Sequence, residues 1–331
     1  MKKVRMLLEV INTKWGLRSI YISLIAILFL FPFFSTHYYT FVFYSGLLMG
    51  LAATGLNIIF GYQGLVSFGH ATYFGIGAYT VALLMKHFNI YSMEVLLLAA
   101  IITTGLISCI IGFLCSRHIE VYFALITLGF GQVFYSLAMK FYHITGGTDG
   151  ISIRMPTLLG FEFKVTRDIF NTYYYYYYGI FILIGLMLLV WIIINSPFGL
   201  ILQTIRENSL RARFIGIDVR KYRWYAFTLS GIISGIAGAL YAPLYGHVAP
   251  DVLFHTLSGE LLFIALLGGY HSFIGPIIGG VVYTFIKTYL ISLTSYYWNF
   301  YLGIILAIII LSFREGIMGL FNLIIRGKTH G

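Results

Sequence analysis

The chain has 331 residues, of which 60% are hydrophobic and only 10% are charged, and its mean hydropathy is +0.90. Soluble domains carry about 25% charged residues, so this composition excludes a water-soluble globular protein. The formal net charge of +10 does not indicate nucleic-acid binding, because Lys and Arg gather at the chain ends and in one central loop, as in the cytoplasmic segments of membrane proteins. The composition predicts an all-α integral membrane protein.

Ten continuous apolar runs are predicted to form membrane segments, since they are long enough for helices and lack the alternation of barrel strands. In chain order they are Ser19–Ser35, Phe41–Phe60, Val66–Met85, Met93–Cys115, Val121–Lys140, Tyr178–Asn195, Trp224–Tyr245, Thr256–Gly268, Ile274–Leu293 and Trp298–Phe313. The motif GGYHSFIGP (Gly268–Pro276) interrupts a run that is too long for one span. We therefore expect a tight hairpin of two segments there.

Orientation follows from the basic residues, which favour the cytoplasmic side. The expected organisation is a cytoplasmic tail at 1–18, a transmembrane domain at 19–313 with a cytoplasmic loop at 196–223, and a cytoplasmic tail at 314–331. The first apolar run lacks a small-residue cleavage site, so it is interpreted as a span and not as a signal peptide.

The largest outer segment is Phe141–Tyr177, which holds the motif TGGTDGIS and ends in a run of six tyrosines, Tyr173–Tyr178. Tyrosine favours the boundary between membrane and water. We expect these rings to form an interfacial belt, in preference to an aromatic cage around a ligand.

The sequence lacks the motifs of the common enzymes. It contains no GxxxxGK[ST] phosphate loop, HExxH, CxxC or GxSxG, so neither ATP hydrolysis, a metal centre nor acyl transfer is predicted for this chain. Cys109 and Cys115 lie in one apolar run and are interpreted as packing residues.

Three ionisable residues fall within or near spans, namely His70, Glu260 and Lys287. Such groups are costly in lipid and are candidates for function by default. Glu260 and Lys287 lie toward predicted span ends, which favours anchoring. A carrier driven by a proton gradient would need a buried carboxylate, for which Glu260 is a weak candidate.

Glycine is dense in Gly55–Tyr79 (GLNIIFGYQGLVSFGHATYFGIGAY). In membranes glycine permits close helix contact and interruptions of a helix. Gln63, Ser67 and His70 in this segment have hydrogen-bonding groups for a polar solute. The residues of this segment are compatible with two interpretations, helix packing alone or the binding of a polar solute.

The central basic loop Ser196–Trp224 begins with Pro197 and Gly199. In it the apolar residues Leu202, Ile205, Leu210 and Phe214 recur at roughly helical spacing between charged residues. This predicts a short amphipathic helix on the cytoplasmic face, which would lie on anionic lipid or in the groove of a partner.

Six segments resemble the permeases of branched-chain amino-acid ABC transporters, in the order found in that family. They are GLNIIFGYQGLVSFGHATYFGIGAYTVALL (Gly55–Leu84), YFALITLGFGQ (Tyr122–Gln132), TGGTDGI (Thr145–Ile151), IRENSLRARFIGIDV (Ile205–Val219), LGGYHSFIGPIIGG (Leu267–Gly280) and FREGIMG (Phe313–Gly319). The second and third segments resemble the LivM-type subunit in preference to its LivH-type partner. The chain departs from the family at Tyr270, His271 and Ser272, where a simpler Gly-Ser or Gly-Thr pair is usual.

The resemblance implies the ABC importer permease fold and a set of partners: a second homologous permease, two ATPase subunits that bind the ATP, and an extracytoplasmic solute-binding protein. The chain itself would hold no cofactor and no metal, and would not be an enzyme. It implies a place in the bacterial plasma (inner) membrane, among lipid and without nucleic acid. Branched-chain amino acids are the expected solute, with urea or short amides as an alternative, and a stand-alone secondary transporter is the competing class.

The resemblance also implies roles for particular residues. Coupling to the ATPase is expected of Arg206, Glu207, Ala212 and Gly216. The translocation path or the seam between permeases is expected at Gln63, Ser67, His70 and Tyr73. Contact with the binding protein is expected at Thr148, Asp149 and Gly150, where an Asp-Gly turn is an equally good interpretation. Gly268, Gly269, Gly275 and Pro276 are expected to shape the hairpin.

Overall fold

The computed structural model describes residues 28–118, 120–294, 296–312 and 316–319. Within these ranges the long elements are all helices, as predicted. Residues 28–34 are helical and belong to the first predicted span, whose earlier part lies outside the described residues. The predicted tail at 1–18 and most of that at 314–331 also lie outside them.

The longer helices follow the predicted runs closely. They are α3 (His37–Gln63), α4 (His70–Phe88), α5 (Met93–Cys115), α6 (Glu120–Lys140), α9 (Tyr176–Ile194), α12 (Val219–Tyr245), α13 (His255–Gly268), α14 (Gly275–Leu293) and α15 (Trp298–Ser312). The run Met93–Cys115 is reproduced with the same bounds. Local sequence sets these ends: α3 stops at Gly64, whose φ of 78° is a left-handed conformation that glycine adopts without strain.

Short elements join the long helices at their ends. They are α7 (Tyr142–Thr145), the 3₁₀ turn η1 (Gly147–Asp149), β1 (Ile151–Ser152), α8 (Arg167–Ile169), the π-helix η2 (Phe170–Tyr175), α10 (Pro197–Glu207), α11 (Ser209–Phe214), β2 (His247–Val248) and the 3₁₀ turn η3 (Pro250–Leu253). The strands β1 and β2 pair antiparallel, with Ile151 opposite Val248.

Six helical stretches among the described residues are long and apolar enough to cross a membrane. The predicted count of about ten segments is therefore not confirmed. The helix α4 is not among the six, and α13 has only 14 residues. At 1.5 Å per residue α13 is about 21 Å long, which is shorter than the roughly 30 Å hydrocarbon layer.

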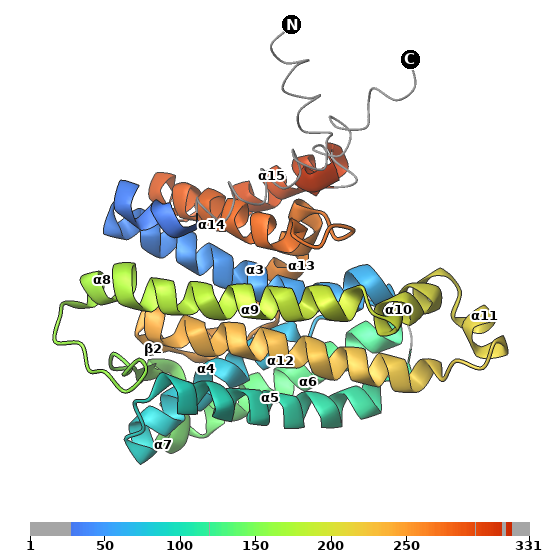
Figure 1. Ribbon diagram of the computed structural model, residues 1–331, viewed down its shortest axis with the longest axis horizontal. Coiled ribbons are helices and arrows are strands. Elements are labelled where there is room, and N and C mark those ends of the chain that lie inside the picture. The colour runs from blue at the N-terminus through green and yellow to red at the C-terminus, as the bar shows by residue number, and fades with distance from the viewer. Residues whose placement is uncertain (1–27, 119, 295, 313–315, 320–331) are drawn as a thin grey trace, which may run out of the picture.

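The long helices run roughly along one direction, and the short elements gather at the two ends of the bundle (Figure 1). The helices α10 and α11 lie at one end, while α7, α8 and β2 lie at the other. This arrangement agrees with the predicted separation of the basic loop 196–223 from the outer segment Phe141–Tyr177.

The helices α4 and α12 touch through their backbones. A Cβ atom on Gly77 would meet the carbonyl oxygen of Gly235, and a Cβ atom on Gly238 would meet that of Phe74. Glycine at such positions lets two helices in a membrane approach closely. At Gly77, therefore, the glycine-rich segment acts in helix packing.

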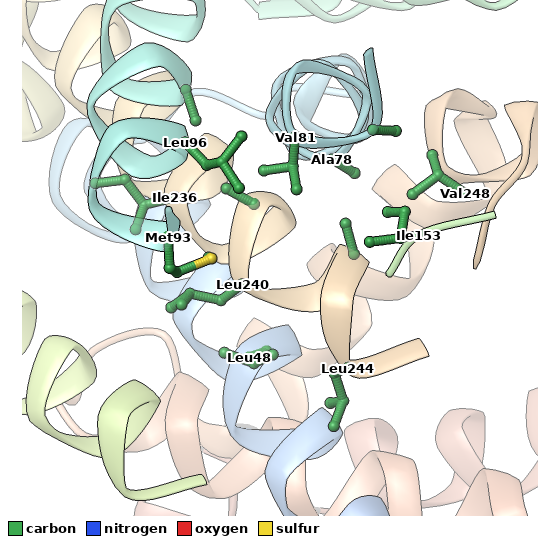
Figure 2. Packing of buried hydrophobic residues seen from close by; sticks show 14 of the residues in the cluster. Leu48, Ala78, Val81, Met93, Leu96, Ile153, Ile236, Leu240, Leu244 and Val248 are labelled. Atoms are coloured by element: carbon green, nitrogen blue, oxygen red, sulfur yellow. The ribbon is translucent and has the colours of Figure 1, made fainter. Parts of the chain in front are cut away.

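A cluster of apolar side chains fills the space at the outer half of the bundle (Figure 2). It joins α3, α4, α5 and α12 to the small β-ladder, through Leu48, Ala78, Val81, Met93, Leu96, Ile153, Ile236, Leu240, Leu244 and Val248. The outer segment is thus anchored on the membrane helices.

Two rings of the tyrosine run differ from the predicted interfacial belt. Tyr175 and Tyr176 are fully buried. Their hydroxyls donate to the carbonyl oxygens of Leu240 at 2.7 Å and Leu28 at 2.6 Å. These two rings pack inside the bundle because each hydroxyl finds a backbone acceptor there, which satisfies the polar group on burial.

We expect Gly238→Ala to destabilise the protein by about 1–3 kcal/mol, because the new methyl group would press on the backbone of α4. The measurement is the thermal unfolding midpoint in mild detergent. Gly185→Ala on α9 is the matched control, since no described heavy atom lies within 4 Å of a Cβ placed there. Equal midpoints for the two variants would contradict the proposed backbone contact.

Candidate functional site

The predicted amphipathic helix of the basic loop consists of two helices. The helix α10 ends at Glu207 and α11 starts at Ser209. Between them Asn208 has an extended backbone, and its side chain accepts hydrogen bonds from the N–H groups of Leu210 and Arg211. Asn208 therefore caps the second helix and changes the direction of the chain.

This break corrects the predicted apolar face. Leu202 and Ile205 on α10 are buried, but Leu210 and Phe214 on α11 are 60% and 82% exposed. The helical spacing that aligned all four residues does not continue through Asn208, because the extended residue resets the register. Only the α10 part of the predicted face packs against the protein.

The exposed residues of α11 and its end form a patch with mixed character, which we term the α11 patch: Leu210, Arg211, Arg213, Phe214 and Ile215. Ile215 is 72% exposed, and both arginines are exposed. Ala212 is buried beneath it. Gly216 is exposed, with a left-handed φ of 87°. Large exposed apolar residues beside cations are typical of a surface that another protein or the lipid headgroup layer covers.

Arg206 connects α10 to the ends of two other helices. Its guanidinium donates to the carbonyl oxygen of Gly61 on α3 and lies 5.6 Å from the ring centre of Tyr270. Asn57 on α3 donates to the carbonyl oxygen of Tyr270 at 3.0 Å. Sequence reasoning treated Tyr270 only as a departure from the family, yet its ring and carbonyl connect the α13–α14 turn to α3 and α10.

A hollow of about 380 Å³ opens beside this junction, lined by Gly61, Tyr62, Gln203, Arg206, Glu207, Tyr270 and His271. Glu207 is exposed at its edge. The coupling residues predicted from the sequence thus gather at one end of the bundle. Their assignment to ATPase coupling stays a prediction.

Asp218 starts α12 beyond the α11 patch. Its carboxylate accepts a hydrogen bond from the Lys221 backbone N–H at 3.2 Å and pairs with the Lys221 ammonium at 3.3 Å. The backbone hydrogen bond, aided by that ammonium, holds the pKa of the Asp218 carboxyl below its usual value. The connection from α11 into α12 is therefore fixed by a charged cap.

His70 lies in a buried polar network at the start of α4. Its Nδ1 is 3.0 Å from the hydroxyl of Ser67, and its Nε2 is 2.7 Å from the hydroxyl of Ser230 on α12. The Ser230 hydroxyl also donates to the carbonyl oxygen of Gly55 on α3. Both imidazole nitrogens are thus occupied, and the network joins α3, α4 and α12.

Gln63 and Tyr73 are buried with this network. The exposed fractions are 3% for Gln63, 0% for Ser67 and His70, and 1% for Tyr73. Within this chain the four side chains contribute to packing between helices. Their predicted place in the translocation path or at the permease seam stays a prediction.

The motif Thr148-Asp149-Gly150 lies at the opposite end of the bundle. Thr148 and Asp149 are exposed, and the Tyr142 hydroxyl donates to the Asp149 carboxylate at 2.7 Å. That hydrogen bond raises the pKa of Tyr142. Gly150 has a φ of 66° and leads into β1, so the motif is a turn whose surface is open. Contact with a binding protein stays a prediction.

The expected break within Thr256–Leu293 is present. Gly268 ends α13 and Gly275 starts α14. A Cβ atom on Gly268 would meet the carbonyl oxygen of Gly275, and Gly269 has a φ of 103°. These glycines shape the turn, as predicted. Pro276 occupies the first turn of α14, where its missing N–H is tolerated.

Glu260 and Lys287 form an ion pair that sequence reasoning missed. The Lys287 ammonium lies 2.8 Å from both carboxylate oxygens of Glu260. The pair joins α13 to α14, and its side chains are 28% exposed for Lys287 and 20% exposed for Glu260. The partners lie 27 positions apart in the sequence, so no local signal indicates this contact.

The fold and these sites define a polytopic helical membrane protein with a structured basic segment at one end of the bundle. The sequence profile described as "Branched-chain amino acid transport system / permease component" matches residues 38–313. The chain belongs to this family of transport permeases, whose members are transport components and not enzymes.

Individual relatives agree with this assignment. The chain is 31% identical over 246 residues to the high-affinity branched-chain amino acid transport system permease protein LivM of Escherichia coli (strain K12), and 32% identical over the same length to that of Salmonella typhimurium. Each match covers 69% of this chain and 58% of the relative.

A probable LivH permease of Methanocaldococcus jannaschii is 28% identical over 73% of this chain and 76% of its own length. No solved structure matches the chain. The resemblance to the LivM-type subunit that the sequence motifs indicated is confirmed by the two LivM relatives.

We expect His70→Ala to lower the stability of the protein by about 3 kcal/mol, because it leaves buried hydroxyl groups without their partner. The thermal unfolding midpoint in detergent measures this loss. His87→Ala is the control, since His87 is exposed at the end of α4. An unchanged midpoint combined with lost transport would instead place His70 in the translocation path.

Proposed function

We propose that this chain is a permease subunit of an ATP-binding-cassette importer that moves branched-chain amino acids across the bacterial plasma membrane. ATP is hydrolysed by two partner ATPase subunits, and a second homologous permease completes the path. An extracytoplasmic binding protein delivers the solute to the outer end. Both termini lie in the cytoplasm.

The family match over residues 38–313 carries the proposal, and the α11 patch supports it. Phe214 and Leu210 are 82% and 60% exposed within this chain, as expected of side chains that a partner protein covers. An ATPase docked on this patch would cover the apolar side chains, while Arg211 and Arg213 fix the register through charge. Charged residues around an apolar centre are typical of protein interfaces.

The junction at Arg206 gives this docking a mechanical role. ATP binding would draw the two ATPases together and displace α10 and α11. Because Arg206 holds the carbonyl oxygen of Gly61, the displacement passes to α3 directly and not only through the chain. Access would then alternate between outside and inside as the equilibrium of the permease pair shifts.

The choice of solute rests mainly on the family and on the relatives named for branched-chain amino acid transport. Aliphatic side chains differ by methylene groups, each worth only about 1–3 kcal/mol of discrimination in an apolar pocket. Selection among them is therefore assigned to the binding protein. Urea and short amides are the alternative solutes for the same mechanism.

A secondary transporter driven by a proton gradient is the alternative class. It would require a membrane carboxylate that takes up and releases a proton. The candidate, Glu260, is already occupied, since both of its carboxylate oxygens lie 2.8 Å from the ammonium of Lys287. The ion pair therefore counts against Glu260 as a proton carrier.

The test is affinity purification of the chain from its native host in mild detergent, with mass spectrometry of the proteins retained. We expect a second permease and an ATPase subunit. Phe214→Asp should reduce recovery of the ATPase about tenfold or more, as removal of a central interface anchor does.

Phe161→Asp is the matched control, because Phe161 is 69% exposed but lies in the outer segment. It should leave ATPase recovery unchanged.

Arg206→Ala should retain the ATPase and uncouple its hydrolysis from uptake, since the link to Gly61 is lost. Recovery of the chain alone, with solute uptake in ATP-free proteoliposomes, would refute the importer and favour a secondary carrier.

A further inference from the structure

The helix α13 begins in the interior of the bundle. Its first residue, His255, is 2.7 Å from the Gln132 side chain, which lies near the middle of α6. Ser258 accepts a hydrogen bond from the Ala71 N–H at the start of α4. With about 21 Å of length, α13 extends from this level to the α13–α14 turn. It is thus a short helix that starts inside the bundle, and transporters use interrupted helices where solutes bind.

One face of α13 is left open by the rest of the described chain. Thr256 and Phe263 are exposed, and Gly259 has no described heavy atom within 4 Å of a Cβ placed on it. Together with Glu260 these residues follow the spacing i, i+3, i+4, i+7, which places them on one side of a helix. We term them the α13 face: Thr256, Gly259, Glu260 and Phe263.

The composition of the α13 face does not suit contact with lipid. On α9, the large residues that project outward are Phe181, Leu188, Leu189, Trp191 and Ile192. The α13 face instead carries a hydroxyl and a carboxylate. Ionisable groups at membrane depth face a protein interior or a water-filled cavity. The α13 face therefore borders a protein interior or a water-filled cavity, and not lipid.

The ion pair lies at the edge of this face. Lys287 is 28% exposed and Glu260 is 20% exposed, so a solute has access to both charges. The Lys287 ammonium is 5.2 Å from the ring centre of Trp298 and 5.9 Å from that of Tyr283. These rings stabilise the cation when its partner turns to another group.

We propose that the α13 face and Lys287 form an intramembrane binding site for a zwitterionic aliphatic amino acid. The ammonium of the solute pairs with Glu260 and its carboxylate pairs with Lys287, so one ion pair is exchanged for two. The exposed ring of Phe263, one turn along the helix, contacts the aliphatic side chain. The open position at Gly259 leaves room for the backbone of the solute.

This inference rests on the proposed function and narrows its choice of solute. A neutral site with separated charges matches a neutral solute with separated charges. Urea and short amides carry no formal charges and gain little from opening an ion pair. The site thus favours amino acids over the alternative solutes.

The test probes a cysteine on the α13 face in native membranes. Thr256→Cys is introduced after Cys109 and Cys115 are changed to alanine, and the rate of modification by a charged, water-soluble methanethiosulfonate reagent is measured. Leu188→Cys on α9 is the matched control at a position facing lipid. We expect Thr256→Cys to react about tenfold faster or more, because thiolates form in water and not in lipid.

Protection then identifies the solute. L-Leucine should slow the modification of Thr256→Cys, and urea at the same concentration should not. Adding Glu260→Gln should abolish protection by leucine, measured as the ratio of the rates with and without leucine in the same variant. Equal rates at the two cysteines, protection by urea, or protection that survives Glu260→Gln would each overturn the proposed site.

Reversing the charges of Glu260 and Lys287 distinguishes a solute-binding role of the pair from a purely structural one. The double variant Glu260→Lys with Lys287→Glu keeps the pair but reverses the orientation of a bound zwitterion, which moves its side chain away from Phe263. We expect a normal thermal midpoint with lost protection by leucine; retained protection would overturn the site. The cysteine-modification and protection measurements do not require an ATPase, so their outcome is independent of the co-purification test. If no ATPase co-purifies, the importer is refuted but the proposed binding site is not.

Discussion

The contact between the backbones of α4 and α12 is the constraint on which the rest of the structure depends. Where Gly77 meets Gly235 and Gly238 meets Phe74, no side chain separates the two helices. This closeness places Ser230 within reach of His70 and lets α3 share the same network. Without hydrophobic attraction between helices in lipid, such packing and internal hydrogen bonds are what hold a membrane bundle together.

The features outside this central contact lie at the two ends of the bundle. At one end α10 is attached by Arg206, and α11 projects beyond it with apolar groups exposed. At the opposite end the β-ladder and the buried tyrosines fix the segment between α6 and α9. Between the ends, α13 starts at the level where α4 starts. One bundle thus combines an exposed apolar patch, a short interior helix and an anchored end segment.

Local sequence patterns predict much of this fold, but they do not predict the contacts between residues that are distant in the sequence. Helices such as Met93–Cys115 follow from uninterrupted apolar runs, and the α13–α14 turn follows from its glycines. The break at Asn208 was missed because an asparagine cap competes with helix continuation on nearly equal terms. The contacts of Arg206 with Gly61 and of Glu260 with Lys287 join distant positions, so no periodicity in the chain could reveal them.

The helix α3 has the same close backbone contact on a second side. A Cβ atom on Gly50 would crowd the backbone of Ile277 on α14, and one on Gly55 would crowd that of Ser230 on α12. Backbone atoms, unlike side chains, have no rotamers with which to repack around such a contact. In the proposed importer α3, α12 and α14 would therefore shift together when α10 is displaced, and the change of access would fall at the boundary between the two permeases.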